Sequence, residues 1–334
     1  MKKRVTMRDI GAALGVSTVT ISKALGGKEG VSDAVRARIL EAAEEMGYQY
    51  VAPAVEMHES NNEIIGILTR EQFFDNTSFY ACMYREMTRY LLESGMLGVL
   101  EIIPKARENE MPNVIQDRRV SGLILMGQFP ATAVDMVAEA GLPAVLLDFY
   151  SEHVDSDAVV SDGQGGGYLL TQELIEAGHR RIAFVGSIEK TTSIMDRYDG
   201  YLRALVLSNI SPRQDWLIPD RDDDGRYLLT LPLPEEMPTA FVCNNDEVAY
   251  RIIRQLRKRG LRVPEDVSVT GFDDFLRHEN KEPFVTTYRV DVERMAQMTV
   301  QRLRQRIRDG SEGPIRMVVG GWLIRRDTIA PPPN

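Results

Sequence analysis

Apolar residues recur at helical spacing in three short stretches within the first fifty residues. The first comprises Met7, Ile10, Ala13 and Leu14, the second Val16, Val19, Ile21, Ala24 and Leu25, and the third Val35, Ile39, Ala42, Ala43 and Met46. Each predicted helix has a residue suited to cap its start, because Thr6, Ser17 and Ser32 offer hydroxyl groups to the unpaired amides of a first turn. The pattern therefore predicts three short helices.

After residue 62 the pattern changes to short apolar runs separated by helical stretches. The runs occupy residues 64–69, 98–103, 122–127, 143–149, 181–186, 239–244 and 267–272. Helices are expected at 79–95 and 131–141 in a first series, and at 166–177, 195–208 and 247–259 in a second. Apolar strands that alternate with helices are typical of parallel sheets covered on both faces. Two such series predict two doubly wound lobes.

The turn between the first two predicted helices is too tight for antiparallel packing, as in a helix-turn-helix motif. In that motif the N-terminal residues of the second helix contact base edges in the major groove. The second helix here carries Thr18, Thr20, Ser22 and Lys23, which all donate hydrogen bonds, and it has no acidic residue. We interpret this region as a DNA-binding head; a plain N-terminal bundle of three small helices is the alternative.

The charge distribution agrees with a DNA-binding head. Residues 1–32 hold six Lys and Arg residues against two acidic ones, a net charge of +4, whereas the whole chain is at −9. A basic head on an acidic body indicates a phosphate-contacting module joined to a part with another task.

Length and composition exclude several classes of protein. At 334 residues and 43% hydrophobic content, the chain is long enough for one large or two medium cores besides the head. No run approaches the roughly eighteen apolar residues of a membrane span, and "MKKR" is not followed by a signal-peptide core. Cys82 and Cys243 predict buried thiols, and the four histidines lack metal-ligand spacing. We expect a cytoplasmic protein with no membrane partner, no metal and no cofactor.

Polar residues follow several apolar runs of the body. Asp148 ends one run, Asn245 and Asp246 follow another, and Asp273 follows a third, while Arg197 lies near the start of the expected 195–208 helix. Ligands of doubly wound sheets bind beyond the carboxyl ends of the strands. One cation among several acceptors would suit a polyhydroxylated solute. For Asp246, helix capping is an equally open interpretation.

The stretch "VTMRDIGAALGVSTVTISKALGGKEGVSDAVRARILEAAEEMGY" resembles the DNA-binding head of the LacI/GalR family of bacterial repressors, and it matches that family's pattern nearly throughout. By this resemblance Thr18, Val19 and Lys23 select base pairs, and Thr6, Ser17, Thr20, Ser22 and Ser32 contact phosphates. The division is physically compatible, because Lys23 can reach guanine acceptors while hydroxyl groups position a protein on the backbone.

The body is similar to the same family in "VSDGQGGGYLLTQELIEAGHRRIAFVGS", "DRYDGYLRAL", "CNNDEVA", "LRVPEDVSVTGFDD" and "RVDVERMAQMTVQRL". With the polar residues above, this resemblance gives a set of predicted effector-binding residues: Arg197, Asp273, Asn245, Asp148, Phe79 and Tyr80. For Phe79, a core aromatic is the alternative. The resemblance also implies a homodimer with an interface helix within residues 289–308.

The predicted fold is a small all-α helix-turn-helix head plus an α/β body of two doubly wound parallel-sheet lobes, as in periplasmic binding proteins. The predicted divisions are a head at 1–48, a hinge at 49–62 and a body at 63–330. Lobe one would take about 63–160 and 290–317, and lobe two about 161–289 and 318–330.

Two stretches depart from the family pattern. By resemblance, the linker "YQYVAPAVEMHES" would place Ala54 and Met57 in the minor groove, but Glu56 would repel phosphates there. The segment "IPDRDDDGRYLLTLPLPEEMPTAF" is shorter and richer in proline than its family counterpart. Whether Trp216 or Tyr227 contacts the effector is therefore left open.

These features predict a transcriptional regulator, specifically a bacterial, nucleoid-associated repressor that binds a pseudo-palindromic operator as a homodimer. A sugar or sugar derivative bound between the lobes would control it, with a nucleobase or nucleoside as the minority option, and the direction of the control is open. The alternatives are a solute-binding module or an α/β enzyme acting on a sugar. Against the enzyme, "DGQGGGY" lacks both G-x-G-x-x-G and the P-loop lysine.

Overall fold

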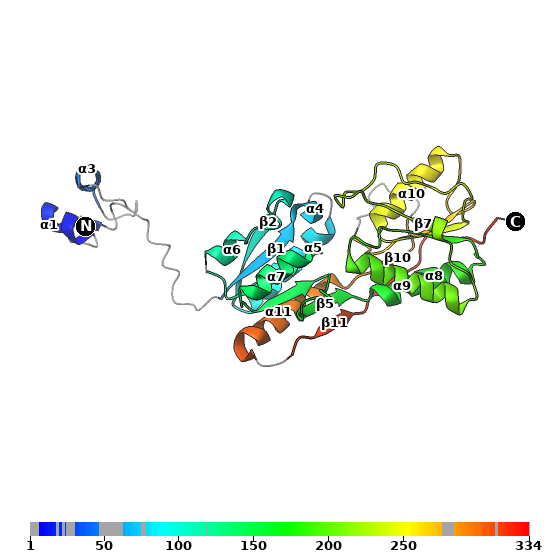
Figure 1. Ribbon diagram of the computed structural model, residues 1–334. Helices are drawn as coiled ribbons and strands as arrows, with labels where there is room; N and C mark the ends of the chain where they lie inside the picture. Colours follow the sequence, from blue (N-terminus) through cyan, green and yellow to red (C-terminus); the bar gives the residue numbers. More distant parts are fainter. Residues whose placement is uncertain are drawn as a thin grey trace. The chain divides into compact units, whose positions relative to one another are not determined.

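The computed structural model describes residues 7–17, 20–21, 24, 31–46, 63–74, 78–117, 119–275, 284–310 and 313–333. The chain forms two compact units, Met1–Asn61 and Asn62–Asn334, which are the head and the body (Figure 1). Each unit has its own hydrophobic core.

The head is helical. Helix α1 spans Met7–Leu14, α3 spans Asp33–Glu45, and Thr20, Ile21 and Ala24 are also in helical conformation. Its core consists of the buried side chains Ile10, Ile21, Ala24, Ile39 and Ala43. All five come from the predicted apolar stretches, so the predicted core is largely confirmed.

The prediction is wrong for one core residue of the head. Ala13 is exposed, and Gly11 is buried in its place. On the apolar face of this helix, Ala13 lies between Ile10 and Leu14, and both of these side chains are larger than that of Ala13. A methyl group contributes little apolar area, so its exposure costs little.

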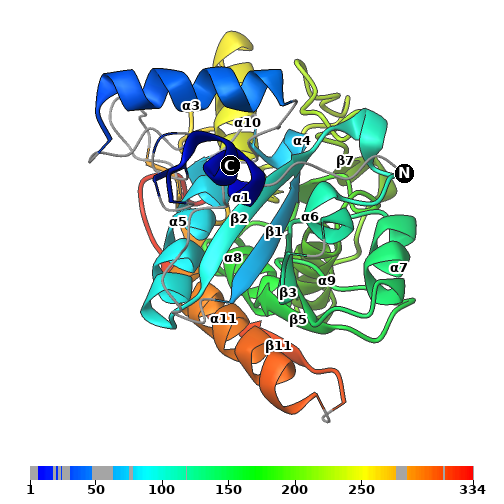
Figure 2. The same ribbon diagram turned by 90° about the vertical axis from the view of Figure 1, so that its left-hand side faces the viewer.

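Lobe one contains a six-stranded parallel sheet in the order β11-β5-β4-β3-β1-β2. Its strands are β1 (Ile64–Arg70), β2 (Leu97–Ile103), β3 (Gly122–Met126), β4 (Ala144–Leu147), β5 (Asp157–Ser161) and β11 (Arg316–Val319). Helices α5 (Ser78–Glu93) and α11 (Val292–Asp309) cover one face of this sheet, and α6 (Asn113–Gln116) and α7 (Ala131–Glu139) cover the other (Figure 2).

Alternate residues of each strand in this sheet pack against the helices on its two opposite faces. In β3, Ile124 and Met126 pack toward α5 and α11, whereas Leu123 and Leu125 pack toward α7. Because side chains of a strand alternate between faces, a strand covered on both sides must be apolar at every position. This requirement explains the uninterrupted runs in the sequence.

Lobe two contains a four-stranded parallel sheet in the order β7-β6-β8-β9. Its strands are β6 (Ile182–Val185), β7 (Leu217–Ile218), β8 (Ala240–Cys243) and β9 (Ser268–Thr270). Helices α8 (Gly163–Glu176) and α9 (Thr192–Leu207) cover one face, and α10 (Asp246–Lys258) covers the other (Figure 1). A further pair, β10 (Thr287–Arg289) and β12 (Trp322–Ile324), is antiparallel. The predicted fold class is thus confirmed.

Five strands were not predicted from the sequence, and β5 shows why. It begins at the buried Asp157, which makes the run look polar at its start. Nε of Arg302 lies 2.9 Å from Oδ1 of Asp157, and Nε of Arg306 lies against Oδ2. These ion pairs from α11 compensate for the burial of the carboxylate, and they anchor β5 beside that helix.

Four helices begin earlier than predicted. The side chain of Asp162 accepts a hydrogen bond from Gly165 N and caps α8, so this helix starts at Gly163, not at 166. Thr191 caps α9 in the same way, and α9 starts at Thr192, not at 195. Helices α5 and α10 each start one residue early, at Ser78 and at Asp246. Among the residues that the structure describes, no helix has the length and apolarity to cross a bilayer.

Candidate functional site

A pocket between the two lobes gathers side chains from the carboxyl ends of six parallel strands. From lobe one come residues after β1 and β4 and on α5; from lobe two come residues after β6, β7, β8 and β9. The lining residues are Gln72, Phe73, Phe79, Tyr80, Asp148, Thr191, Ser193, Ile194, Arg197, Arg221, Tyr227, Asn244, Asn245, Asp273 and Phe275. This is the expected ligand position in open α/β sheets.

All six predicted effector residues line this pocket. Arg197 and Asp273 meet directly, because Nη2 of Arg197 donates to Oδ1 of Asp273 at 2.9 Å. Nη1 of Arg197 donates to the carbonyl of Asn244 at 2.6 Å, and the guanidinium carbon lies 3.9 Å from the Phe272 ring centroid. Burial raises the pKa of Asp273, and the guanidinium groups of Arg197 and Arg221 oppose this rise.

Close packing of α8 against α9 sets the position of Arg197. A Cβ added at Gly167 would lie 2.2 Å from the carbonyl oxygen of Arg197, and one added at Gly200 would lie 2.1 Å from the carbonyl oxygen of Gln164. Only glycine permits two helix backbones to approach this closely. The glycine-rich stretch "DGQGGGY" therefore serves helix packing at the start of α8.

Asp148 and Tyr80 form a second buried pair. The hydroxyl of Tyr80 donates to Oδ2 of Asp148 at 2.8 Å. Burial raises the pKa of Asp148 to about 6, while Arg197 and the Tyr80 hydroxyl hold it down. The Tyr80 ring lies 5.1 Å from Phe73 and 5.2 Å from Phe79, so aromatic side chains form the lobe-one wall.

Two aspartates of the pocket have a left-handed backbone conformation. Asp148, directly after β4, has φ 65°, and Asp273, three residues after β9, has φ 93°. Non-glycine residues adopt this conformation rarely, and such outliers concentrate at functional sites. The backbone is held by the sheets, since Asp148 N donates to Val159 O and Asp273 N donates to Tyr288 O, both at 2.8 Å.

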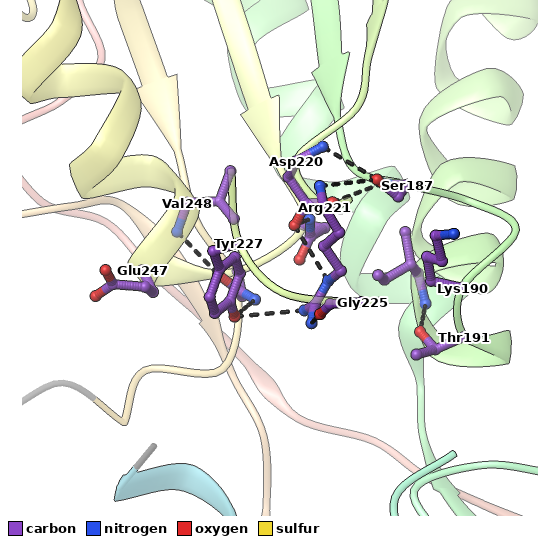
Figure 3. Close-up of polar contacts among 12 residues, drawn as sticks. Ser187, Lys190, Thr191, Asp220, Arg221, Gly225, Tyr227, Glu247 and Val248 are labelled. Atoms are coloured by element: carbon purple, nitrogen blue, oxygen red, sulfur yellow. Dashed lines mark hydrogen bonds and ion pairs between the residues drawn. The ribbon is translucent and has the colours of Figure 1, made fainter. Parts of the chain in front are cut away.

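Asn245 has a role in both the fold and the pocket. Its Oδ1 accepts a hydrogen bond from Val248 N at 2.9 Å and caps α10, while its Nδ2 donates to the Tyr227 hydroxyl at 2.9 Å (Figure 3). The cap of α10 is therefore Asn245 and not Asp246. Asp246 is buried away from the pocket, where its Oδ1 accepts from the Thr287 hydroxyl.

Sequence reasoning missed Arg221 and left Tyr227 open. Nη2 of Arg221 donates to the Tyr227 hydroxyl at 3.3 Å, and its guanidinium carbon lies 4.5 Å from the Tyr227 ring centroid (Figure 3). Burial raises the pKa of Tyr227. Arg221 follows β7, a strand of two residues that leaves no detectable run in the sequence.

A buried network holds Arg221 in place. Oδ1 of Asp220 accepts from Ser187 N, and Oδ2 accepts from Nδ2 of Asn244, both at 2.8 Å. The Ser187 hydroxyl in turn accepts from the backbone amides of Asp220 and Arg221 at 3.1 Å (Figure 3). The Asp220 carboxylate lies 3.4 Å from Nε of Arg221, so the guanidinium has a fixed counter-charge.

Two other residues near the strand ends lie outside the pocket. Trp216 is buried in the core beside α10, where its Nε1 donates to Glu236 O at 3.1 Å. Asp274 pairs with Arg289 and Arg326 at 2.7 and 2.6 Å. These groups support lobe two and do not line the cleft.

Four buried polar atoms of pocket-lining residues have no hydrogen-bond partner within the described part of the chain. One of them, Nε of Arg221, lies 3.4 Å from the Asp220 carboxylate. The other three are Oδ1 of Asp148, Nε of Arg197 and Oδ1 of Asn244. An unpaired buried polar group is costly, so a ligand that bonds it gains free energy. Two acceptors and one donor beside aromatic rings match hydroxyl groups on a compact apolar frame. The described residues contain no cluster of His, Cys, Asp or Glu arranged to hold a metal.

In the head, three predicted DNA-contacting residues are described. The Ser17 hydroxyl accepts from Thr20 N at 3.1 Å, so Ser17 is the N-cap that the sequence predicted. Ser17 and Ser32 are exposed and Thr20 is half-buried, with its hydroxyl 2.9 Å from that of Ser17. The remaining predicted residues lie outside the described residues: Thr6, Thr18, Val19, Ser22, Lys23, Ala54 and Met57.

Two family models match the chain. Residues 6–50 match the bacterial regulatory proteins of the lacI family, and residues 171–329 match a periplasmic binding protein-like domain. The structure resembles that of the complex of the transcriptional regulator CelR with cellobiose, with a TM-score of 0.70, 26% identity, and coverage of 97% of this chain and 100% of that one.

Curated relatives match over nearly the whole length. The ribose operon repressor of Haemophilus influenzae is 27% identical over 330 residues, which cover 97% of this chain and 98% of that protein. The HTH-type transcriptional repressor PurR of Aliivibrio salmonicida is 28% identical over 317 residues, covering 91% and 92%. The chain thus joins a DNA-binding domain of the lacI family of bacterial regulatory proteins to a periplasmic binding protein-like domain, and it is a DNA-binding transcriptional regulator and not an enzyme.

Proposed function

We propose that this protein is a transcriptional repressor whose affinity for its operator is set by a small carbohydrate bound between the two lobes. The observation that carries the proposal is the inter-lobe pocket with its three unpaired buried polar atoms beside aromatic rings. Hydroxyl groups both donate and accept, so a single sugar ring could satisfy Asp148, Arg197 and Asn244 together.

The relatives support a small polar effector. One is named as a ribose operon repressor, and the similar CelR structure holds cellobiose. The pocket also favours a neutral ligand, because the guanidinium groups of Arg197 and Arg221 are already matched by Asp273 and Asp220. An unpaired anionic ligand would disturb this balance.

The proposed DNA contacts lie in the head. Thr18, Val19 and Lys23 would contact bases, Thr6, Ser17, Thr20, Ser22 and Ser32 would contact phosphates, and Ala54 and Met57 would enter the minor groove. Residues 1–48 would then form the head, 49–62 the hinge and 63–330 the body. Two copies would bind a pseudo-palindromic operator, with α11 at the lobe-one interface, in the cytoplasm and at the nucleoid.

Effector binding would act on the contacts between the lobes. Oε1 of Gln128 accepts from Thr192 N at 3.0 Å, and the Tyr150 hydroxyl donates to Oδ1 of Asp196 at 3.0 Å. The free cavity between the pocket side chains is about 50 Å³, which holds a few water molecules but no sugar ring. The lobes must therefore move when the effector binds, and this movement would reach the hinge. Effector and operator would alter each other's affinity by the same factor.

Operator footprinting with and without candidate sugars tests the proposal. The protein should protect its own promoter region at low salt, and a bound sugar should shift the protecting concentration at least several-fold. A solute-binding module, the second candidate, would bind a sugar yet protect no DNA with the head either present or deleted. Protection that no sugar, nucleobase or nucleoside alters would contradict control by an effector.

A further inference from the structure

A second cavity, lined by residues of both lobes, adjoins the effector pocket. It has a volume of about 340 Å³, against about 50 Å³ for the inner one. Gln72, Arg221 and Tyr227 line both cavities. We call the second cavity the vestibule; its other lining residues are Glu71, Lys105, Glu108, Asp224, Gly225, Arg226, Leu229 and Arg251. Most of the free space beside the cleft therefore lies in the vestibule.

A short turn builds the boundary between the two cavities. Arg221 and Tyr227 pair across it as an antiparallel bridge, and Asp222 N donates to Arg226 O at 2.9 Å. Gly225 at its tip has φ 78°, and Asp224 pairs there with Lys105 of lobe one (Figure 3 shows Arg221, Gly225 and Tyr227). The turn therefore reaches across the cleft and carries two pocket side chains at its base.

The side chains of this boundary are restrained from the lobe-two side. The guanidinium carbons of Arg221 and Arg251 lie 4.5 and 4.9 Å from the Tyr227 ring centroid. Arg251 is itself held by Glu247 at 3.0 Å. Cations over a tyrosine ring stabilise its position. The Tyr227 hydroxyl thus stays directed at Asn245, at the junction of the two cavities.

The vestibule mixes donors and acceptors. Of its three acids, Glu71, Glu108 and Asp224, the last two are paired with Arg70 and Lys105, so the charge of these two is largely compensated. Arg226 makes no ion pair with any other residue that the structure describes, and it is exposed. Closely spaced carboxylates, guanidinium groups and one amide around an aromatic ring suit a neutral, hydroxylated ligand. A phosphate group would meet the carboxylates as well as the cations.

We propose that the vestibule is a second subsite of the effector pocket and that the effector is a disaccharide or longer glycoside. One ring would lie between Arg197 and Tyr80, and the next would pass Gln72 and Tyr227 to reach Arg226. The inference rests on the sugar response proposed above, and it goes further by fixing the size of the ligand. Admission of the second ring requires the turn at Gly225 to move from lobe one.

The test compares sugars built from the same rings. The full-length protein is titrated calorimetrically with D-glucose, D-galactose, D-fructose and D-xylose, and with cellobiose, maltose, lactose, melibiose, sucrose and xylobiose. We expect one disaccharide to bind at least roughly tenfold more tightly than either of its component rings, since one well-placed ring can contribute that factor. Glucose 6-phosphate is included as an anionic probe.

Two arginine variants distinguish the contribution of the vestibule to ligand affinity from that of the inner pocket. Arg226→Ala should weaken the tightest disaccharide roughly three- to tenfold and leave the affinity for its inner-ring monosaccharide unchanged. Arg254→Ala is the matched control, because Arg254 is a similarly exposed arginine of α10 that does not line the vestibule. It should change neither affinity.

Three results would overturn the inference. The first is a monosaccharide that binds as tightly as any disaccharide containing it, and the second is an Arg226→Ala variant that weakens both ligands equally. The third is glucose 6-phosphate as the tightest ligand; all three leave the sugar response itself intact. If no sugar binds and none alters operator protection, the proposed function fails and this inference fails with it.

Discussion

Nη2 of Arg197 donates to Oδ1 of Asp273 at 2.9 Å in the centre of the effector pocket, and each side chain is less than a tenth exposed. The pair joins α9 to the segment that follows β9, so both of its members belong to lobe two. Nε of the same guanidinium remains without a hydrogen-bond partner among the described residues. One residue therefore supports lobe two and offers a donor to the cleft.

Arg197→Ala should abolish the response to effector and leave operator binding intact. It should also lower the free energy of unfolding by about 3 kcal/mol, because it leaves the buried Asp273 carboxylate unpaired. Replacing both residues, Arg197→Met with Asp273→Asn, should restore much of this stability without restoring the response, because asparagine removes the carboxylate charge and tolerates the left-handed backbone at this position. Dose–response curves on the operator and urea unfolding measure the two effects. An unaltered dose–response curve in Arg197→Ala would show that this residue does not bind the effector.

Asp148 should make the stability of the body depend on pH. Its pKa is about 6 in the folded protein against 3.8 for an unperturbed aspartate, so the folded state binds more protons between these values. The free energy of unfolding should fall as pH rises through this window, by about 3 kcal/mol in total. Asp148→Asn should remove this part of the profile.

Unfolding in urea at intervals from pH 4 to 7 measures the difference between the wild type and Asp148→Asn. Tyr80→Phe should move the midpoint upward, because the Tyr80 hydroxyl stabilises the ionised carboxylate. Asp135→Asn, at an exposed site on α7, is the control. Equal profiles for Asp148→Asn and Asp135→Asn would contradict the role of Asp148.

Ser17 should have two separable roles in the head, as an N-cap and as a phosphate contact. Ser17→Ala should lower the stability of the head by about 1 kcal/mol through loss of the bond from Thr20 N. Ser17→Asp should keep the cap and repel DNA phosphates, so stability should hold while operator affinity falls. Amide hydrogen exchange of the head and fluorescence anisotropy with operator DNA distinguish the two. Ser17→Asp binding as tightly as the wild type would exclude the phosphate contact.

Lys23→Ala should change which operator bases are discriminated, whereas Thr20→Ala should weaken binding on all sequences. A side chain that bonds a base edge contributes about 1–3 kcal/mol of discrimination, and a phosphate contact contributes none. Binding to the operator, to single-base variants and to random duplexes measures both effects at one salt concentration. Equal losses of Lys23→Ala on operator and random DNA would argue against a base contact.

The pocket residues that sequence reasoning found share one property. Arg197, Asp148, Asn245 and Asp273 stand at the ends of long apolar runs or on the helix that follows one, so the end of each strand is visible in the pattern. Arg221 follows a strand of two residues, and its position depends on a buried network with Asp220 and Ser187. No local pattern marks such a residue.

The assignment of aromatic residues shows the same limit. Trp216 and Tyr227 were equivalent candidates in the sequence, yet Trp216 lies in the core and Tyr227 lines the pocket. The choice depends on the packing of the 217–239 segment against α10. Likewise, the sequence left the cap of α10 open between neighbouring polar residues, and the backbone geometry selected Asn245.

The sequence by itself determined the three-helix head, the two series of buried strands and the positions at which these strands end. Helical and strand periodicities are local, and an uninterrupted apolar run requires burial on both faces of a sheet. Only the tertiary structure decided which polar residues meet across the cleft, how Asp157 is compensated and why a vestibule lies beside the pocket. Those features depend on contacts between residues far apart in the chain, such as Arg197 with Asp273 and Lys105 with Asp224, and such contacts leave no periodic trace.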